Sequence, residues 1–234
     1  MDLSAIVPLP ISAADDKAAA FLPLAGEAAL PRVVSALIDA VIEPGRVVVA
    51  AAQPLIDDAR ESLASQGFST VSLVEVGGTG NRARCIAAAL AHLDGAAFST
   101  SHVLLHDMSQ PLVSSEVRDR VVAGLHGGGG VVMPAHAVTD SVKLVDGHGS
   151  VTGTVDRSAL RAVQYPRGFD VHQLAALLSR AASSEFDELA AVLAEGVRIT
   201  VVDGDADGFR VELPRDLQFV EAVMGSRPPD LRGS

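Results

Sequence analysis

Short apolar runs alternate with longer segments of helical spacing along the first half of this chain, and this alternation strongly limits the folds open to it. The runs, rich in Val, Ile, Leu and Ala, are residues 5–8, 47–52, 71–75, 103–106 and 131–134. The segments with helical apolar spacing are residues 30–41, 55–66, 82–93 and 115–125. Strands and helices that alternate in this way build a largely parallel sheet with helices on both faces. The sequence therefore predicts an α/β fold with a twisted, mostly parallel sheet.

The pattern changes after residue 134. Two β-prone runs, 141–145 and 151–155, flank Gly147-His148-Gly149, which predicts a hairpin. Further helices are expected at residues 171–182 and 186–195, strands at 197–202 and 209–212, and a closing helix from 214 to about 224. Since no repeat or low-complexity linker interrupts the chain, we expect one domain over residues 1–226 and a frayed tail at 227–234.

The composition argues against nucleic-acid and membrane partners. Eighteen basic residues against 29 acidic ones give a formal net charge of −11, which repels phosphate backbones. The apolar runs are shorter than the roughly 20 residues of a membrane span, and the first residues are acidic rather than basic, so we expect a cytoplasmic protein. Cys85 is the one cysteine, which excludes an intrachain disulfide and a zinc site built from cysteines.

An aspartate follows the fourth apolar run directly. Asp107 comes after His106, at the end of a predicted buried strand. Open α/β sheets bind their ligands at the carboxyl ends of the strands, so Asp107 is the strongest candidate for a site residue. An aspartate at this place can also simply cap the following turn. For His106, a buried and hydrogen-bonded histidine is favoured over a general base.

Three segments occur together in an order typical of one family. They are residues 103–111, 154–160 and 165–169, and they resemble the 2-C-methyl-D-erythritol 4-phosphate cytidylyltransferases over about residues 6–223. The resemblance implies a Rossmann-like nucleotidyltransferase fold with a protruding β-arm at about 136–160. It also implies CMP transfer from CTP to a sugar-alcohol phosphate in isoprenoid precursor biosynthesis, with Mg²⁺ bound and pyrophosphate leaving.

The resemblance assigns residues to the metal and to the acceptor phosphate. Asp107 corresponds to the family's aspartate near the metal and the sugar phosphate, while Gln110 stands where the family has arginine. The segment Asp140-Ser141-Val142-Lys143 resembles the family's Asp-Thr-(Ile/Met)-Lys, with a hydroxyl kept at Ser141. Asp107 is therefore expected to act in catalysis and hold Mg²⁺, with Gln110, Ser141 and Lys143 at the substrate.

Two arginines are expected to bind phosphate. Arg157 belongs to an arm motif whose arginine, in the family, reaches the substrate phosphate of the partner subunit, so the resemblance implies a homodimer. Arg210 takes the position of an active-site lysine, and a planar guanidinium changes the geometry at a phosphate. Asp187 lies in a segment that resembles the family's Thr-Asp-(Asp/Glu), with Phe186 in place of the substrate-facing threonine, and the resemblance makes Asp187 a further substrate-binding candidate. Ordinary surface roles remain open for Arg157, Arg210 and Lys143.

The segment from Gly77 to Cys85 resembles the family's contact with the nucleotide base and ribose. It keeps the two glycines, Gly77 and Gly78, and the arginine, Arg82, with one residue inserted. Arg84 and Cys85 replace an acid and a hydroxyl. Gly77, Gly78 and Arg82 are thus the nucleotide-binding candidates, whereas Cys85 fits a small buried apolar residue.

The front of the chain departs from the family. The family's first strand leads into a loop of the form Ala-Ala-Gly-x-Gly-x-Arg, followed by Pro-Lys, which wraps the triphosphate. Residues 8–17 contain no glycine and no arginine, and their prolines remove N–H donors. Ala19 falls at the usual lysine position and Lys17 is displaced by two residues, so Lys17 is either a shifted catalytic cation or a solvated lysine.

Three hypotheses about function follow. The first is the family's cytidylyltransferase reaction, impaired by the loss of the loop, with weak or absent CTP binding. The second is a catalytically inactive paralogue that binds a sugar phosphate or acts in regulation. The third is a transferase with another nucleotide or acceptor, since fold analogy alone does not choose among them.

Overall fold

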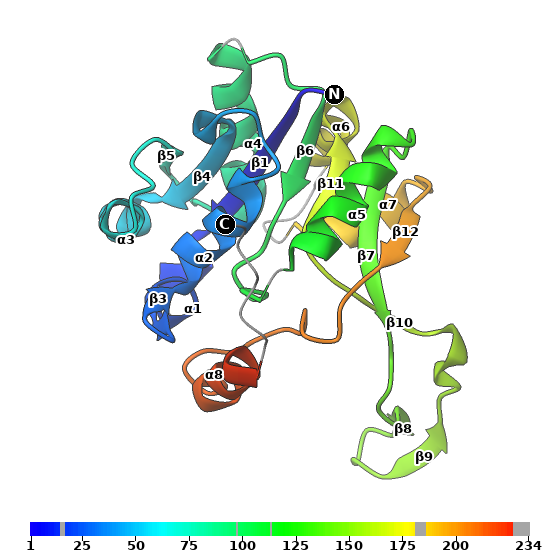
Figure 1. Ribbon diagram of the computed structural model, residues 1–234. Helices are drawn as coiled ribbons and strands as arrows, with labels where there is room; N and C mark the ends of the chain where they lie inside the picture. The colour runs from blue at the N-terminus through cyan, green and yellow to red at the C-terminus, as the bar shows by residue number, and fades with distance from the viewer. Residues whose placement is uncertain (15–16, 97, 113, 181–185, 227–234) are drawn as a thin grey trace.

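A central twisted sheet with helices on either side forms most of the computed structural model (Figure 1), which describes residues 1–14, 17–96, 98–112, 114–180 and 186–226. The strands of this sheet are β1 (Leu3–Leu9), β4 (Val47–Ala52), β5 (Ser72–Val76), β6 (His102–Leu105), β7 (Val131–Ala137), β10 (Arg161–Val163), β11 (Arg167–Asp170) and β12 (Thr200–Asp203). They run in the order β10-β7-β11-β6-β1-β4-β5, and β12 also pairs with β7.

The remaining elements are helices, short turns and two small ladders. The helices are α1 (Ala18–Phe21), α2 (Ala29–Ile38), α3 (Ile56–Ser65), α4 (Arg82–Gly95), α5 (Ser115–His126), α6 (Val171–Arg180), α7 (Glu188–Ala194) and α8 (Leu217–Ser226). The 3-10 turns are η1 (Ile11–Ala14), η2 (Pro44–Arg46), η3 (Gln53–Leu55) and η4 (Arg157–Ala159). The ladders join β2 (Pro23–Leu24) to β3 (Glu27–Ala28) and β8 (Lys143–Val145) to β9 (Val151–Thr154). None of the helices in the described ranges has the length and apolar character that crossing a membrane requires.

The parallel part of the sheet confirms the predicted fold class. β1 pairs in parallel with β4 and β6, and β4 pairs in parallel with β5. β1 is buried along its whole length, as expected for a strand covered on both faces. The five apolar runs of the first half correspond to β1, β4, β5, β6 and β7. The helices predicted between them correspond to α2, α3, α4 and α5.

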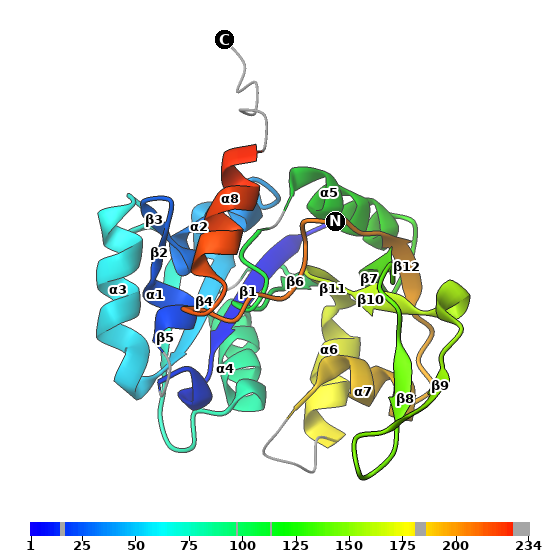
Figure 2. The ribbon, with the colours of Figure 1, turned by 90° about the horizontal axis from the view of Figure 1, so that it is seen from below.

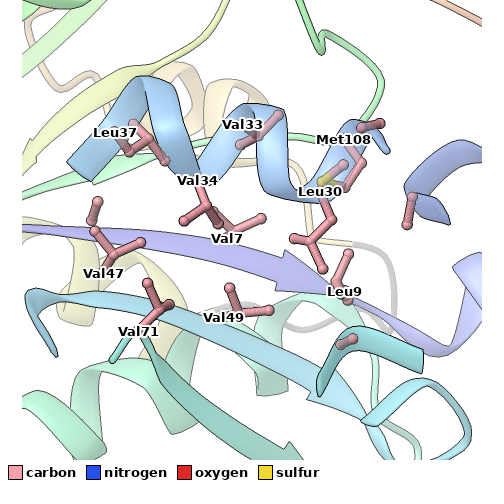
Figure 3. Packing of buried hydrophobic residues seen from close by; sticks show 14 of the residues in the cluster. Val7, Leu9, Leu30, Val33, Val34, Leu37, Val47, Val49, Val71 and Met108 are labelled. Carbon is pink, nitrogen blue, oxygen red and sulfur yellow. The ribbon is translucent and has the colours of Figure 1, made fainter. Parts of the chain in front are cut away.

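Two layers of helices enclose this sheet. Figure 2 shows α2, α3, α5 and α8 on one face and α4, α6 and α7 on the other. Along α2 the fully buried residues Leu30, Val33, Val34 and Leu37 recur at helical spacing. They lie over Val7 and its neighbours on the sheet, as Figure 3 shows. Burying such side chains stabilises the fold by about 1.5–3 kcal/mol each, so the sheet that carries the site is held from both sides.

β11 lies antiparallel between β6 and β7 and is not among the strands predicted from the sequence. Its four residues contain a single large apolar side chain, Phe169, which is fully buried, so no apolar run marks this strand. Gly168 allows α5 to pack closely, because a Cβ there would lie 2.9 Å from side-chain atoms of Leu125 and Val121. The insertion places Arg167 opposite Leu105, the last residue of β6.

The predicted strand at residues 209–212 is wrong. The backbone N–H of Val211 donates to the carbonyl oxygen of Ser109, in the loop after β6, over 2.7 Å. That bond ties the segment to the sheet's carboxyl edge instead of to a neighbouring strand. The closing helix α8 begins at Leu217 rather than residue 214, and α7 begins at Glu188 rather than 186. Residues 181–182 of the helix predicted at 171–182, and the tail at 227–234, lie outside the described residues.

The predicted hairpin is confirmed as the antiparallel pair β8–β9. Figure 1 shows it standing well away from the central sheet. Leu144, Val145 and Val151 are 55%, 61% and 65% exposed on it. A two-stranded ladder of this size is marginal alone, so its apolar side chains call for a cover that this chain does not provide within its described residues.

Candidate active site

Side chains from four separate parts of the chain meet beside the carboxyl end of β6. We call them the Arg82 cluster: Arg82, Asp107, Tyr165, Arg167 and Glu188. Arg82 and Glu188 are the first residues of α4 and α7, and Arg167 is the first residue of β11. The site therefore lies at the sheet edge where ligands bind in open α/β folds.

Arg82 is the centre of the cluster. Its Nη1 atom lies 2.5 Å from Asp107 Oδ2, and its Nη2 and Nε atoms lie 3.0 and 3.2 Å from the two carboxylate oxygens of Glu188. Burial by itself lowers the pKa of Arg82, but attraction to Glu188, Tyr165 and Asp107 outweighs burial and raises it. Arg82 thus stays charged and joins both carboxylates, one of them in the two-pronged geometry that suits a guanidinium.

Tyr165 and Arg167 complete the partners of Glu188, whose side chain is only 1% exposed. The Tyr165 hydroxyl donates to Glu188 Oε1 over 2.5 Å, and Arg167 Nη1 lies 3.1 Å from the same oxygen. The Arg167 guanidinium also lies 4.2 Å from the centre of the Tyr165 ring. Burial raises the pKa of Tyr165, so the hydroxyl remains a neutral donor. Two arginines balance two carboxylates, which is what a buried set of charges requires.

Asp107 is held ionised and fully paired. Its Oδ1 atom accepts hydrogen bonds from the backbone N–H and the hydroxyl of Ser109, at 2.9 and 2.6 Å. Burial would raise the pKa of Asp107, but the Arg82 guanidinium and the Ser109 donors outweigh it and lower that pKa. Gln110, the residue after Ser109, accepts from the backbone N–H of Tyr165 over 2.8 Å through its side-chain oxygen. Gln110 therefore joins the β6 loop to the Arg82 cluster.

His106 is fully buried beneath the cluster. Its Nδ1 atom accepts from the backbone N–H of Asp107 over 2.6 Å, and its ring stacks on Tyr165 with 5.7 Å between ring centres. The Nε2 atom has no hydrogen-bond partner among the described residues. The interpretation of His106 as a satisfied buried histidine therefore holds for one of its two ring nitrogens.

Folding should depend on pH through His106. Burial lowers its pKa to about 4 from an ordinary value of 6.5. As the pH falls, His106 binds a proton in the unfolded chain before it does so in the folded protein. The free energy of unfolding should therefore not be reduced by His106 above pH 6.5, and it should drop between pH 6.5 and pH 4. The drop should reach ~3 kcal/mol. Urea unfolding at a series of pH values measures it. In His106→Gln the drop over this window should be lost, and an unchanged drop would contradict the assignment.

A pocket of about 390 Å³ lies next to the Arg82 cluster. We call it the Arg210 pocket; its lining residues are Ala19, Ser109, Arg210, Val211, Glu212, Leu213 and Arg215. Ser109 belongs to both parts of the site, since its hydroxyl donates to Asp107. The Val211 bond to Ser109 fixes the segment that carries Arg210 against this loop. Asp107 and Arg210, 103 positions apart in the chain, are thereby brought into one site.

The N-terminal segment contributes Ala19, but not Lys17, to the Arg210 pocket. Ala19 of α1 lines the Arg210 pocket, whereas Lys17 Nζ lies 2.5 Å from Asp58 Oδ2 on α3. The two charged side chains are 50% and 41% exposed. The structure therefore shows Lys17 in a surface ion pair, the solvated alternative, and its predicted catalytic role stays a prediction.

The glycine-rich turn between β5 and α4 holds the other predicted nucleotide contacts. Gly77 and Gly78 follow β5, and Gly78 has a φ of +71°, a conformation that favours glycine. Gly80 has a φ of +50°, and a Cβ there would lie 2.8 Å from the Cβ of Ala52. The N–H of Ile11 donates to the carbonyl oxygen of Gly80 over 2.8 Å, which ties the front segment to this turn.

The predicted arm residues are not brought to this site within one chain. Arg157 is exposed and donates to the carbonyl oxygen of Thr139. Lys143 Nζ lies 2.8 Å from Thr154 Oγ1 across the hairpin, and Ser141 is exposed beside it. Figure 1 places this arm at a distance from the carboxyl end of β6. A role for Ser141, Lys143 and Arg157 in substrate binding therefore requires a second chain.

Asp187 caps a helix, and its neighbour enters the cluster. Its Oδ1 atom accepts from the backbone N–H groups of Leu189 and Ala190, at 2.8 and 3.1 Å, so it starts α7. Glu188 is thereby directed inward. The sequence motifs point to Asp187 as a site residue but not to Tyr165, Arg167 or Glu188. All three lie inside the motif segments, but no local pattern shows that they share a partner.

The residues as arranged do not fit a Mg²⁺ ion held by the protein. Among the described residues no group of three or more His, Cys, Asp or Glu side chains is placed to hold a metal. Protein-bound Mg²⁺ needs one or two carboxylates and completes its shell with water or substrate phosphate. Asp107 offers one carboxylate, and the Arg82 guanidinium already occupies the oxygen that Ser109 leaves free.

Comparisons with known proteins agree with one another. The family model for 2-C-methyl-D-erythritol 4-phosphate cytidylyltransferase (IspD) matches residues 12–226. The enzyme of that name from Rhodococcus opacus is 34% identical over 210 residues, which cover 90% of this chain and 88% of that protein. A bifunctional IspD/IspF enzyme from Clavibacter michiganensis is 35% identical over 205 residues, 88% of this chain and 49% of that protein. The crystal structure of the cytidylyltransferase from Thermus thermophilus superposes with a TM-score of 0.71 at 26% identity, over 95% of this chain and 98% of that one.

Proposed function

Because the chain belongs to the 2-C-methyl-D-erythritol 4-phosphate cytidylyltransferase family, we propose that it transfers CMP from CTP to the phosphate of 2-C-methyl-D-erythritol 4-phosphate. An oxygen of the acceptor phosphate attacks the α-phosphorus of CTP, the bond from that phosphorus to the β-phosphate oxygen breaks, and pyrophosphate leaves. The observation that supports the proposal is the hydrogen bond from Val211 to Ser109, which joins the segment of Arg210 to the Asp107 loop at the sheet's carboxyl edge. The product would serve isoprenoid precursor biosynthesis.

Phosphoryl-type transfer asks a protein mainly for positioning and for stabilisation of developing charge. In this proposal Arg210 faces the phosphates in its pocket, and Asp107 with Ser109 forms the neighbouring wall. Gly77 and Gly78 lie in the turn that would take the base and ribose. Arg82 would act by holding Asp107 and Glu188 in place, since it binds both carboxylates. Any Mg²⁺ would have to come with the phosphates of CTP.

The direct test is pyrophosphate release. Purified protein with CTP, 2-C-methyl-D-erythritol 4-phosphate and MgCl₂ should release pyrophosphate in step with formation of the cytidine-diphosphate product, as measured by a coupled phosphate assay and mass spectrometry. ATP, GTP and UTP serve as comparisons for the nucleotide. If none of the four nucleotides is turned over while the acceptor still binds, the proposal is overturned. The hypothesis of an inactive paralogue that binds a sugar phosphate would then remain.

The arm supports a proposal about assembly. We propose that residues 1–226 form one domain, acting in the cytoplasm as a homodimer in which the arm at about 136–160 reaches the partner's site. The exposed Leu144, Val145 and Val151 on the arm would be covered by the second chain. Arg157, Ser141 and Lys143 on the arm would then approach the acceptor phosphate bound at the partner's site. Gln110, in the loop after β6, would contact the acceptor from the site itself.

We expect light scattering to report twice the chain mass of 24.1 kDa. Replacing Val145 and Val151 by Ser should shift the protein towards monomer, because these side chains are more than half exposed in one chain and burying an apolar side chain is worth about 1.5–3 kcal/mol. The exposed Leu193 on α7, changed to Ser, is the matched control and should leave the mass unchanged. A wild-type monomer at all concentrations would contradict the shared site.

A further inference from the structure

The Arg210 pocket contains a second guanidinium, that of Arg215, to which neither the family motifs nor the proposed reaction assigns a role. Arg215 lines the pocket together with Arg210, from the short stretch between the Val211–Ser109 hydrogen bond and α8. Figure 1 shows the segment that leads from β12 to α8 passing below the ends of the central strands. Arg215 therefore reaches the site from the far end of the chain.

The other side of the pocket lacks the expected positive charge. Ala19, at the position where the resemblance places a lysine, contributes only a methyl group to the lining. Lys17 pairs with Asp58 on α3. Among the pocket's lining residues the positive charges are Arg210 and Arg215, with Glu212 as the one acid.

Arg215 is available to a ligand. Its ion pair with Glu212, 3.2 Å from Nη1 to Oε2, joins two side chains that are 80% and 65% exposed. An exposed pair of this kind contributes little to stability, so exchanging Glu212 for a phosphate costs little. Arginine also suits this exchange because its planar guanidinium can contact two phosphate oxygens at once.

The backbone around Arg215 is held in place. The N–H of Glu212 donates to Asp216 Oδ2 over 2.9 Å, which closes a turn around Arg215. Val211, immediately before Glu212, is joined to Ser109 and through it to the Asp107 loop. Arg210 directly precedes the residue bonded to Ser109, and Arg215 lies in the turn that follows, so both arginines are carried by one segment fixed against the Asp107 loop.

We propose that Arg215 is a phosphate-binding residue of the Arg210 pocket and supplies the positive charge that Ala19 does not. The two guanidiniums together would hold the leaving pyrophosphate part of a nucleoside triphosphate. The proposal rests on the proposed transferase function for the identity of the ligand. The anion site itself can be tested without turnover.

The experiment measures binding of pyrophosphate, without added divalent cation, by calorimetry. Arg215→Ala should weaken binding at least tenfold, since it removes a charge-assisted contact, and Arg215→Lys should recover part of the loss. Glu212→Gln should tighten binding, because it frees Arg215. Arg60→Ala is the matched control: Arg60 also forms an exposed pair three residues along the chain, with Asp57 on α3, and its loss should change nothing.

Equal binding by Arg215→Ala and Arg60→Ala would overturn the proposal, as would wild-type protein that binds no pyrophosphate. The outcome for the proposed function is separate. If pyrophosphate binding depends on Arg215 but CTP and the acceptor give no product, the anion site stands and the transferase function fails. If product forms at the same rate in wild type and Arg215→Ala, and pyrophosphate binding is also unchanged, the function stands and the role of Arg215 fails.

Discussion

Replacing Glu188 by Ala should lower the free energy of unfolding by about 3–5 kcal/mol, the scale for removing one partner from a buried ion pair. The Glu188 side chain is 1% exposed and receives Arg82, Arg167 and the Tyr165 hydroxyl. Its loss leaves Arg167 without its carboxylate and Arg82 with Asp107 alone. Urea unfolding followed by circular dichroism measures the change.

A matched variant distinguishes the effect of the Arg82 cluster from the effect of removing a glutamate from the first turn of a helix. Glu116 also lies in the first turn of a helix, α5, but is exposed, so Glu116→Ala should change the free energy of unfolding by no more than about 0.5 kcal/mol. Glu188→Gln keeps the size of the side chain and removes the charge, and it should fall between the two. If Glu188→Ala behaves like Glu116→Ala, the Arg82 cluster does not hold these segments together.

Replacing Arg210 by Ala should reduce kcat about 10²–10³-fold in the pyrophosphate-release assay, the usual scale for removing one donor that stabilises transition-state charge. Arg210 lines the pocket beside the Asp107 loop, and no other lining residue except Arg215 is positively charged. Arg210→Lys should recover part of the rate, although an ammonium cannot reproduce the planar contact of a guanidinium.

The control for Arg210 is another exposed arginine. Arg180 lies on α6, pairs with Glu195 and has no place in the pocket, so Arg180→Ala should leave kcat unchanged. Thermal unfolding of both variants should match wild type, since both side chains are exposed. An increase of KM with unchanged kcat in Arg210→Ala would show that Arg210 binds substrate and transition state equally, and would contradict its assignment to catalysis.

The front segment, residues 8–17, offers few groups that could bind the triphosphate of CTP. Residues 8–17 contain no glycine and no arginine, and α1, directly after them, contributes Ala19 to the pocket. The expectation of weak CTP binding therefore stays a prediction. Calorimetry with CTP, run beside the pyrophosphate titration, separates the contribution of the two arginines from that of the base and ribose.

Local sequence patterns are enough to establish the layered α/β architecture and the edge of the sheet at which the candidate site lies. The spacing of apolar residues and the composition suffice for this. Each buried parallel strand is a local apolar run, and each covering helix has apolar residues at helical spacing. Asp107 could be placed at a strand end for the same reason. The family motifs further identified Arg82, Arg157 and Arg210 as candidates, since they lie in short segments that can be recognised one at a time.

Which charged side chains pair with one another depends on how distant segments pack. Arg82 meets Asp107 and Glu188, which lie 25 and 106 positions further along the chain. Such a contact depends on how α4, β6 and α7 pack, and no local spacing encodes it. The same holds for β11, whose place between β6 and β7 comes from long-range backbone hydrogen bonds. The Arg210 pocket likewise brings together three distant segments, those of Ala19, Ser109 and Arg215. These segments become neighbours only once the sheet has formed, so no local pattern encodes the pocket.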